Sequence, residues 1–383
     1  MSRLLLLLKS YSVNFLVAGI AFVIGLLIIE GLARIFYDPV NFFKPELIPD
    51  EILRHKLVPG SGGHDAWGYR NEEVPDSVTI VAIGDSQTYG ISADSQDSWP
   101  HQLGDLLDEK VYNLSLGGYG PVQYAYMLEN QALTLKPRSI ITGFYLGNDL
   151  YDSYHMAYKQ EYWRSLRDPA LQNIGDTSKL YDIVFTPKPT GFLLKRWLAN
   201  NSMVYNMVFV HSFIGDYIRG KRNIEKVQGD STLTLFNDKK DNVSATFLPS
   251  MRLYSLNLDD KKIKEGLRIS LDRLLYMDSL CKSKNIDFMV VIIPTKEMVY
   301  APYLENNSEL RNASIIEELL QNEQKVTDLT TQFFNRHQIK YVEVANDMTN
   351  AIGDNIYPND SDGHPNKKGY GIIASRIRKE LKP

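Results

Sequence analysis

The sequence predicts a three-layer α/β/α protein with a mainly parallel five-stranded sheet, preceded by one apolar N-terminal segment. Short β-branched runs bounded by glycine or proline alternate with stretches of helical character, which is the pattern of consecutive βαβ units. The alternation is present in the first half of the chain, stops between about residues 150 and 260, and then resumes. One sheet with an interruption therefore accounts for the order of the elements.

The expected strands lie near residues 78–84, 111–116, 139–146, 286–294 and 339–344. Helices are expected near residues 98–109, 122–135, 261–284, 311–336 and 366–382. The pair Trp99-Pro100 is typical of a helix start, since proline is tolerated in the first turn. In an open sheet of this kind, ligands bind beyond the carboxyl ends of the strands, so residues that directly follow the strands are the first place to look for a site.

Residues 11–29 contain no charged side chain and are mostly Val, Leu, Ile, Phe, Ala and Gly. This length suits a helix that spans a bilayer. Arg3 and Lys9 precede the run and Glu30 follows it, which favours a cytoplasmic N-terminus and an exported globular domain. We therefore expect residues 1–36 to form a single-pass signal anchor. A cleaved signal peptide is the alternative, although the run exceeds the usual apolar core of about 7–15 residues.

Beyond the apolar segment, residues 37–75 are predicted to be a polar connector and residues 76–383 a single globular domain. The interrupted region 150–260 is predicted to be an inserted helical region of that domain. Because it follows the third strand, it emerges at the ligand-binding edge of the sheet, where a lid or substrate-binding subdomain is plausible. A helical decoration that only buries apolar surface remains the alternative.

Composition excludes several classes of protein. The formal net charge is −4 and no basic tract is present, so nucleic-acid binding is not expected. The single cysteine, Cys281, excludes an intrachain disulfide, but a domain of this size can bury enough core without one. The seven histidines show no ligand spacing such as His-x-x-x-His, so we expect neither a metal site nor a cofactor.

A serine follows the first predicted strand in the run Gly84-Asp85-Ser86. By itself this tripeptide could be a strand-to-helix turn with a serine cap. Near the other end of the chain, the run Asp362-Gly363-His364 supplies a histidine with an acidic residue two positions earlier. Serine, histidine and aspartate are the three parts of an acyl-transfer triad, in which the histidine activates the serine and the carboxylate orients the histidine.

The next two predicted strands also end in small or polar residues. Gly117-Gly118 follows the second strand, and Gly147-Asn148-Asp149 follows the third. Either could be an ordinary loop, because glycine and asparagine suit turns. Both nevertheless fall at the same edge of the sheet as Ser86, where donors to an oxyanion would be needed.

These blocks together resemble the SGNH hydrolases, also called the GDSL esterase family. Ser86, Gly118, Asn148 and His364 match the four residues for which that family is named. The resemblance covers roughly residues 78–149 and the segment from about 339 onward. It implies a flavodoxin-like fold, Ser86 as nucleophile, His364 as base, and an oxyanion hole built from the backbone N–H groups of Ser86 and Gly118 and the Asn148 amide.

The acidic member departs from the common family pattern, which places it three residues before the histidine. That position is Ser361 here, flanked by Asp360 and Asp362. The Asp-x-His spacing resembles the family branch that contains polysaccharide O-acetyltransferases, and by that resemblance Asp362 is the orienting carboxylate. Asp360 remains the alternative.

The expected function is a serine-dependent esterase or O-acyl (acetyl) transferase acting on acylated carbohydrate at the cell envelope, with the catalytic domain extracytoplasmic. The apolar anchor, the Asp-x-His spacing and a tyrosine-rich insertion beside the cleft motivate this expectation, and envelope assembly partners would be compatible with it. A lipase or lysophospholipid esterase at the membrane surface, and a non-catalytic polysaccharide-binding scaffold, are the alternatives. Lys296, after the fourth strand, could contact an acidic sugar or acyl carbonyl, or form a surface ion pair with Glu297.

Overall fold

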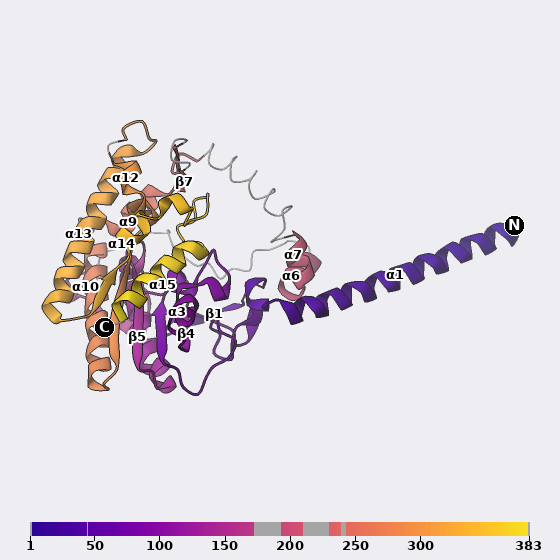
Figure 1. Cartoon of the computed structure of the whole chain (residues 1–383), viewed down its shortest axis with the longest axis horizontal. Helices are drawn as coiled ribbons and strands as arrows, with labels where there is room; N and C mark the ends of the chain where they lie inside the picture. The colour runs from indigo at the N-terminus through magenta and orange to yellow at the C-terminus, as the bar shows by residue number, and fades with distance from the viewer. Residues whose placement is uncertain are drawn as a thin grey trace. The chain divides into compact units, whose positions relative to one another are not determined.

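The computed structural model describes residues 2–43, 45–171, 193–209, 230–238, 243–305 and 307–381. The chain falls into two compact units. The described parts of Met1–Glu46, Ser61–Gly63 and Thr186–Arg222 belong to one unit, which we call the anchor unit. The remaining described residues form the other, which we call the sheet unit (Figure 1).

The sheet unit is built on five parallel strands. They are β3 (Ile80–Gly84), β4 (Val111–Ser115), β5 (Ser139–Tyr145), β8 (Asp287–Ile293) and β9 (Tyr341–Glu343). Their order across the sheet is β4-β3-β5-β8-β9, and every neighbouring pair is parallel. Numbered along the chain this is the flavodoxin-like order 2-1-3-4-5, in which the topological switch point lies between β3 and β5. The predicted fold class is confirmed.

Helices cover both faces of this sheet (Figure 1). Five of them are α3 (Trp99–Leu107), α4 (Pro121–Asn130), α10 (Lys261–Ser283), α13 (Ala313–His337) and α15 (Lys367–Leu381). Residues of α4 and α10 belong to the hydrophobic core on one face, and residues of α3 and α15 to the core on the other. All five helices lie close to where the sequence predicts them, because each carries an apolar face at helical spacing.

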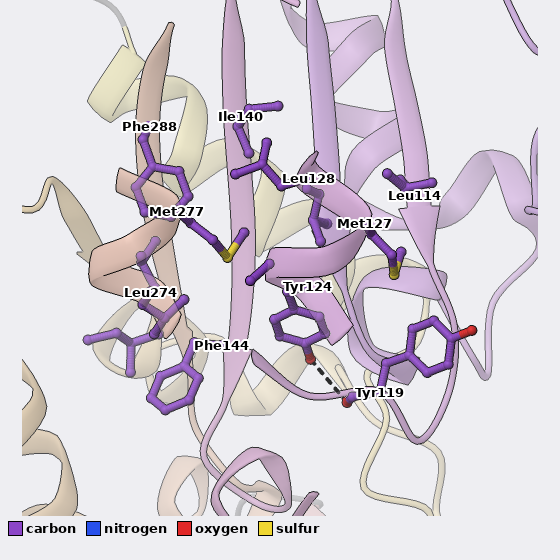
Figure 2. Close-up of a cluster of buried hydrophobic side chains, with 14 of the residues drawn as sticks. Leu114, Tyr119, Tyr124, Met127, Leu128, Ile140, Phe144, Leu274, Met277 and Phe288 are labelled. Atoms are coloured by element: carbon purple, nitrogen blue, oxygen red, sulfur yellow. Dashed lines mark hydrogen bonds between the residues drawn. The ribbon is translucent and has the colours of Figure 1, made fainter. Parts of the chain in front are cut away.

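Alternation along the strands explains why there are two cores. In β3, Val81 and Ile83 belong to one core and Ile80 and Ala82 to the other, since successive side chains point to opposite faces of a sheet. Figure 2 shows the first core, where side chains of β5 meet those of α4 and α10. Each large apolar side chain buried there contributes about 1.5–3 kcal/mol of transfer free energy. Together these buried side chains make the sheet a rigid support for the residues that follow the carboxyl ends of its strands.

Two hairpins were not expected from the sequence. The hairpin of β1 (Leu47–Asp50) and β2 (Arg54–Leu57) lies inside the predicted connector. The region 150–260 was predicted to be helical, and it contains most of α5 (Asp149–Lys159) and α9 (Pro249–Leu256), but it also contains the hairpin of β6 (Thr234–Asp238) and β7 (Val243–Phe247). Residues 172–192, 210–229 and 239–242 of that region lie outside the described residues.

The anchor unit contains α1 (Ser2–Phe36), α6 (Leu193–Asn201) and α7 (Met203–Phe209). Among the described residues, α1 is the one helix long and apolar enough to cross a membrane: its candidate span is Asn14–Phe36, and an 18-residue window of that span has a mean hydropathy of 2.6. By length and composition, either a membrane anchor or a signal sequence fits this helix.

Candidate active site

Ser86 is the first residue of a short helix, α2 (Ser86–Tyr89), that begins just after β3. The Asp85 carboxylate caps this helix by accepting a hydrogen bond from the backbone N–H of Gln87 at 2.8 Å. Gly84 lies so close to α2 that a Cβ at this position would fall 2.0 Å from Thr88 Oγ1. The tight turn that Gly84 allows therefore places Ser86 at the carboxyl end of β3, beside the switch point of the sheet.

Ser86, His364 and Asp362 form a continuous hydrogen-bonded chain. The Ser86 hydroxyl donates to Nε2 of His364 at 2.8 Å, and Nδ1–H of His364 donates to Oδ1 of Asp362 at 2.5 Å. Asp362 also accepts hydrogen bonds from the backbone N–H of His364, at 3.1 Å, and from the hydroxyl of Ser92. This is the arrangement in which a neutral imidazole can take the serine proton while a carboxylate stabilises the resulting imidazolium.

The structure places Asp362, rather than Asp360, against His364. Burial alone would raise the pKa of Asp362, but hydrogen bonds from His364 and Ser92 outweigh it and hold the pKa at about 2. Asp362 is therefore ionised at neutral pH, as an orienting carboxylate must be. The Asp360 carboxylate instead accepts the backbone N–H of Asp362 at 2.9 Å and so supports the turn of the loop.

The loop of residues 358–364, which carries Asp362 and His364, contains no helix or strand. The Lys296 ammonium donates to three backbone carbonyls of this loop, those of Pro358 (3.1 Å), Asp360 (2.8 Å) and Asp362 (3.2 Å). Lys296 is only 2% exposed and belongs to a short helix, α11 (Lys296–Val299), that begins just after β8. The ammonium thus ties the loop to the sheet, which differs from both of the roles expected for it.

Burial lowers the pKa of Lys296 to about 8, against the opposing effect of the carboxylates of Glu297, Asp360 and Asp362. The rings of Phe247 and Tyr357 lie 5.8 Å and 5.5 Å from the ammonium and contribute cation–π contacts. The charge on Lys296 therefore begins to be lost just above neutral pH, and with it part of the attraction that orders the loop.

Two of the predicted oxyanion donors, Gly118 and Asn148, lie in the loops that follow β4 and β5. Gly118 adopts φ 77°, in the left-handed region that favours glycine. A Cβ on its neighbour Gly117 would lie 3.5 Å from Ser86 Cβ, so this loop passes directly beside the serine. Asn148 Nδ2 donates to Oδ2 of Asp152 at 2.8 Å. An amide nitrogen carries two hydrogens, but a hydrogen bond from the Asn148 side chain also lowers the pKa of Asp85, so an oxyanion would have to draw the second hydrogen from that carboxyl.

All five predicted site residues line one cavity of about 430 Å³, namely Ser86, Gly118, Asn148, Asp362 and His364. Two arginines that the sequence analysis missed also line it. Arg54 comes from the β1–β2 hairpin and has φ 71°, an uncommon conformation for a residue with a side chain. Arg252 comes from α9, and its guanidinium donates to the carbonyl of Gly147 at 3.2 Å. No local pattern marks either arginine in the sequence, because both reach the cavity only through tertiary packing.

His55 holds the peptide bond that carries the predicted Gly118 donor. Its Nε2–H donates to the carbonyl of Gly117 at 2.9 Å. Burial lowers the pKa of His55 to about 4, against the raising effect of this hydrogen bond, so the ring is neutral at pH 7. The carbonyl of Gly117 and the N–H of Gly118 belong to one planar trans peptide and point in opposite directions. His55 therefore orients the N–H that is predicted to donate to the oxyanion.

Three buried aspartates underlie the cavity. Burial raises the pKa of Asp85, Asp149 and Asp152, and repulsion from Asp85 adds to the rise for the other two. The Asp149 carboxyl accepts hydrogen bonds from the N–H of Tyr145 and the hydroxyl of Tyr124, both at 3.0 Å. Within the part of the chain that the structure describes, no group of three or more His, Cys, Asp or Glu could hold a metal ion. These aspartates serve as hydrogen-bonding groups that support the strand ends.

The fold and the site together define an α/β/α protein with a serine–histidine–aspartate triad at the switch point of a flavodoxin-like sheet. No protein-family model matches the sequence, and no curated protein matches it either.

Among solved structures, the chain is similar to a lipolytic protein of the G-D-S-L family from Desulfitobacterium hafniense, at 13% identity and a TM-score of 0.38. That match covers 80% of this chain and 100% of the other. A catalytic mutant of an acetylxylan esterase from Geobacillus stearothermophilus matches at 9% identity and a TM-score of 0.38, over 81% and 96% of the two chains. A phospholipase A1 from Streptomyces albidoflavus matches at 10% identity and a TM-score of 0.40, over 80% and 100%. At such TM-scores these likenesses by themselves assign neither a fold nor an activity to this chain.

Proposed function

We propose that this chain is a serine-dependent ester hydrolase or O-acyltransferase of the SGNH hydrolase family. The observation that carries the proposal is the unbroken hydrogen-bonded chain from Asp362 through His364 to Ser86, lining one cavity with Gly118 and Asn148. A scaffold that only binds polysaccharide has no need of a serine hydroxyl aligned on a histidine nitrogen. The geometry therefore favours catalysis over binding alone.

The reaction begins when His364 Nε2 takes the proton of Ser86 Oγ as the oxygen attacks the ester carbonyl. Asp362 holds the imidazole in the tautomer that has its proton on Nδ1 and stabilises the imidazolium. The imidazolium then returns the proton to the leaving alcohol, and an acyl-serine remains. Water or a sugar hydroxyl, deprotonated by the same histidine, removes the acyl group in the second half of the reaction. Hydrolysis and transfer differ only in this acceptor.

The negative charge that develops on the carbonyl oxygen is stabilised by donors from three strand ends. These are the backbone N–H groups of Ser86 and Gly118 and the second amide hydrogen of Asn148. Each such donor typically contributes about 10²–10³ in turnover. His55, which orients the Gly117–Gly118 peptide, and Lys296, which ties down the loop of His364, are positioning residues in this scheme.

The proposed substrate is an acylated carbohydrate at the cell envelope. The cavity combines the guanidinium groups of Arg54 and Arg252 with apolar side chains such as Leu248 and Met251. A cavity of about 430 Å³ has room for a short acyl group, whereas a long acyl chain would need an extended apolar groove. With α1 as a signal anchor and basic residues before it, the catalytic domain would be extracytoplasmic.

The proposal is tested with the full-length chain in lipid nanodiscs, assayed with p-nitrophenyl esters of increasing acyl length beside Ser86→Ala. We expect acetyl ester cleavage in the wild type and its loss in the variant, together with labelling of the wild type alone by a fluorophosphonate probe. Acylated oligosaccharides and free glycan acceptors then separate transfer from hydrolysis. Equal activity of the two proteins would contradict the role of Ser86. Two equally inert proteins, neither labelled by the probe, would favour the non-catalytic scaffold.

A further inference from the structure

Two short helices of the anchor unit, α6 and α7, are fastened to the end of α1. The Glu30 carboxylate accepts hydrogen bonds from the backbone N–H groups at the start of α7, those of Met203 (3.0 Å) and Val204 (3.1 Å), and from the hydroxyl of Ser202 (2.9 Å). The first N–H groups of a helix have no partner within the helix, and a negative charge is favourable there. Glu30 therefore caps α7 from another helix.

Arg34 completes the attachment one helical turn further along α1. Its Nη2 donates to the carbonyl of Asn201, the last residue of α6, at 2.7 Å, and its Nε donates to Glu30 at 2.9 Å. An acid thus meets the positive end of α7, and a base meets the negative end of α6. Ala33, Phe43 and Met203 form a small buried cluster beneath these contacts. One side of the α6–α7 pair is therefore packed against α1.

The pair also carries large apolar side chains that are exposed. Leu194 and Trp197 of α6 are 57% and 60% exposed, and Val208 and Phe209 of α7 are 42% and 58% exposed. Leu194 and Trp197 are three residues apart and so share one face of α6. Phe36 and Tyr37, at the end of α1, are 75% and 55% exposed. An exposed apolar surface of this kind marks a place where a partner or a membrane binds.

The length of α1 indicates the depth at which this surface lies. The uncharged run of residues 11–29 extends about 28 Å along a helix at 1.5 Å per residue. That is close to the thickness of about 30 Å of the hydrocarbon core of a bilayer. Glu30 is the first charged residue after the run, so it marks the boundary of the core. Because Glu30 holds the start of α7, the α6–α7 pair lies at the same boundary, where tryptophan and other aromatic side chains are enriched.

We propose that α6 and α7 lie in the headgroup layer of the bilayer that α1 spans, with Leu194, Trp197, Val208 and Phe209 inserted toward the acyl chains. The inference rests on the membrane anchor included in the proposed function. A lipid surface fits this face because it continues from α1, whose membrane-spanning window is 0% buried. The inserted region, which sequence analysis expected beside the catalytic cleft, thus supplies a second, interfacial attachment to the membrane.

The test places one spin label at a time on the full-length chain in nanodiscs of phosphatidylcholine and phosphatidylglycerol. Cys281 is the single cysteine of the sequence, so Cys281→Ala gives a cysteine-free background to which each labelling substitution adds one reactive thiol. Labels are introduced by L194C and V208C, which keep Trp197 and Phe209. K195C is the matched control on α6, because consecutive residues on a helix are turned by about 100° and Lys195 is exposed. V23C reports on α1 itself.

The measured quantity is the ratio of the collision rates of each label with oxygen and with a water-soluble nickel chelate. We expect this ratio to be highest at V23C and lowest at K195C. At L194C and V208C it should be several-fold higher than at K195C. A high ratio at V23C with water-like ratios at L194C and V208C would overturn the inference while leaving the anchor in place. Low ratios at all sites would overturn the anchor as well. Labels at positions 194 and 208 that neither reagent reaches would mean that protein covers this face, which also overturns the inference.

Discussion

The two halves of the site are held in place by different means. Ser86 and Asn148 directly follow β3 and β5, which are hydrogen-bonded neighbours in the sheet. Asp362 and His364 instead lie on a loop without helix or strand. Parallel register places the first pair without further support, because the strand ends are part of the rigid core. The loop has no neighbouring strand whose N–H groups could bond to its carbonyls. The buried ammonium of Lys296 donates hydrogen bonds to three of these carbonyls instead.

The largest expected effect separates the two candidate acids of the loop half. Asp362→Asn should lower kcat for ester cleavage by about 10⁴, because His364 loses the carboxylate that selects its tautomer and stabilises its positive charge. Asp360→Asn should retain most of the activity, since an amide oxygen can still accept the backbone N–H that the Asp360 carboxylate accepts in the turn. Steady-state kinetics on both purified variants decides between them. Equal losses in the two would remove Asp362 from its proposed role.

Loss of Asn148 from the sheet half should lower kcat less than loss of Asp362 from the loop half. It removes one of three proposed oxyanion donors rather than a member of the triad. Asn148→Ala is expected to lower kcat by about 10²–10³ with little change in KM. Asp152→Asn is the matched control: burial raises the pKa of Asp152, so the neutral amide resembles the group it replaces and can still accept from Asn148. A loss in the control as large as in Asn148→Ala would mean that the Asn148–Asp152 contact matters for packing rather than for the oxyanion.

Lys296→Met tests whether the loop half depends on a cation. We expect kcat to fall by about 10², the size of effect that a misplacement of about 1 Å can produce. In the wild type, activity should also decline above pH 8, as the ammonium with a pKa of about 8 loses its proton. The variant should have low activity without this alkaline decline. A full pH profile of kcat measures both features, and an unchanged alkaline decline in Lys296→Met would assign it to another group.

His55→Ala tests the corresponding support in the sheet half of the site. It removes the hydrogen bond from His55 to the carbonyl of Gly117, which orients the Gly117–Gly118 peptide. One hydrogen bond contributes about 1 kcal/mol, so kcat should fall by roughly fivefold at unchanged KM. His55→Gln, whose amide can still donate to the carbonyl of Gly117, should restore much of the loss. Kinetics of the two variants at pH 7 make the comparison. A similar loss in both would point to packing of the ring against Tyr119, whose centroid lies 5.1 Å away, rather than to the hydrogen bond.

The last prediction concerns stability at acid pH rather than activity. The pKa of Asp362 is about 2 in the folded state, below its usual 3.8, so the unfolded state binds more protons in this range. The resulting stabilisation is present above about pH 4 and is lost as the pH falls toward 2. It amounts to about 2 kcal/mol. Denaturant unfolding of wild type and Asp362→Asn at pH 5 and pH 2.5 should show a smaller pH-dependent loss in the variant.

The sheet was the most predictable part of the chain. The five strands of the parallel sheet lie within two residues of the predicted ranges, because each is a short apolar run bounded by turn residues. The β1–β2 and β6–β7 hairpins escaped prediction, since strands of four or five residues with mixed polarity carry little periodic signal. Of the residues around the cavity, those in motifs after strands could be selected, whereas Arg54, His55 and Arg252 could not.

The sequence by itself determined the element order, the apolar segment and the four motif residues, because these depend on local composition and on where strands end. Only the tertiary structure decided which aspartate faces His364, what Lys296 binds and which side chains support the oxyanion peptide. The physical reason is distance along the chain. Ser86 and His364 are 278 positions apart, and Lys296 meets carbonyls 62 to 66 positions away. Such contacts are selected by packing of the whole domain, and no local pattern records them.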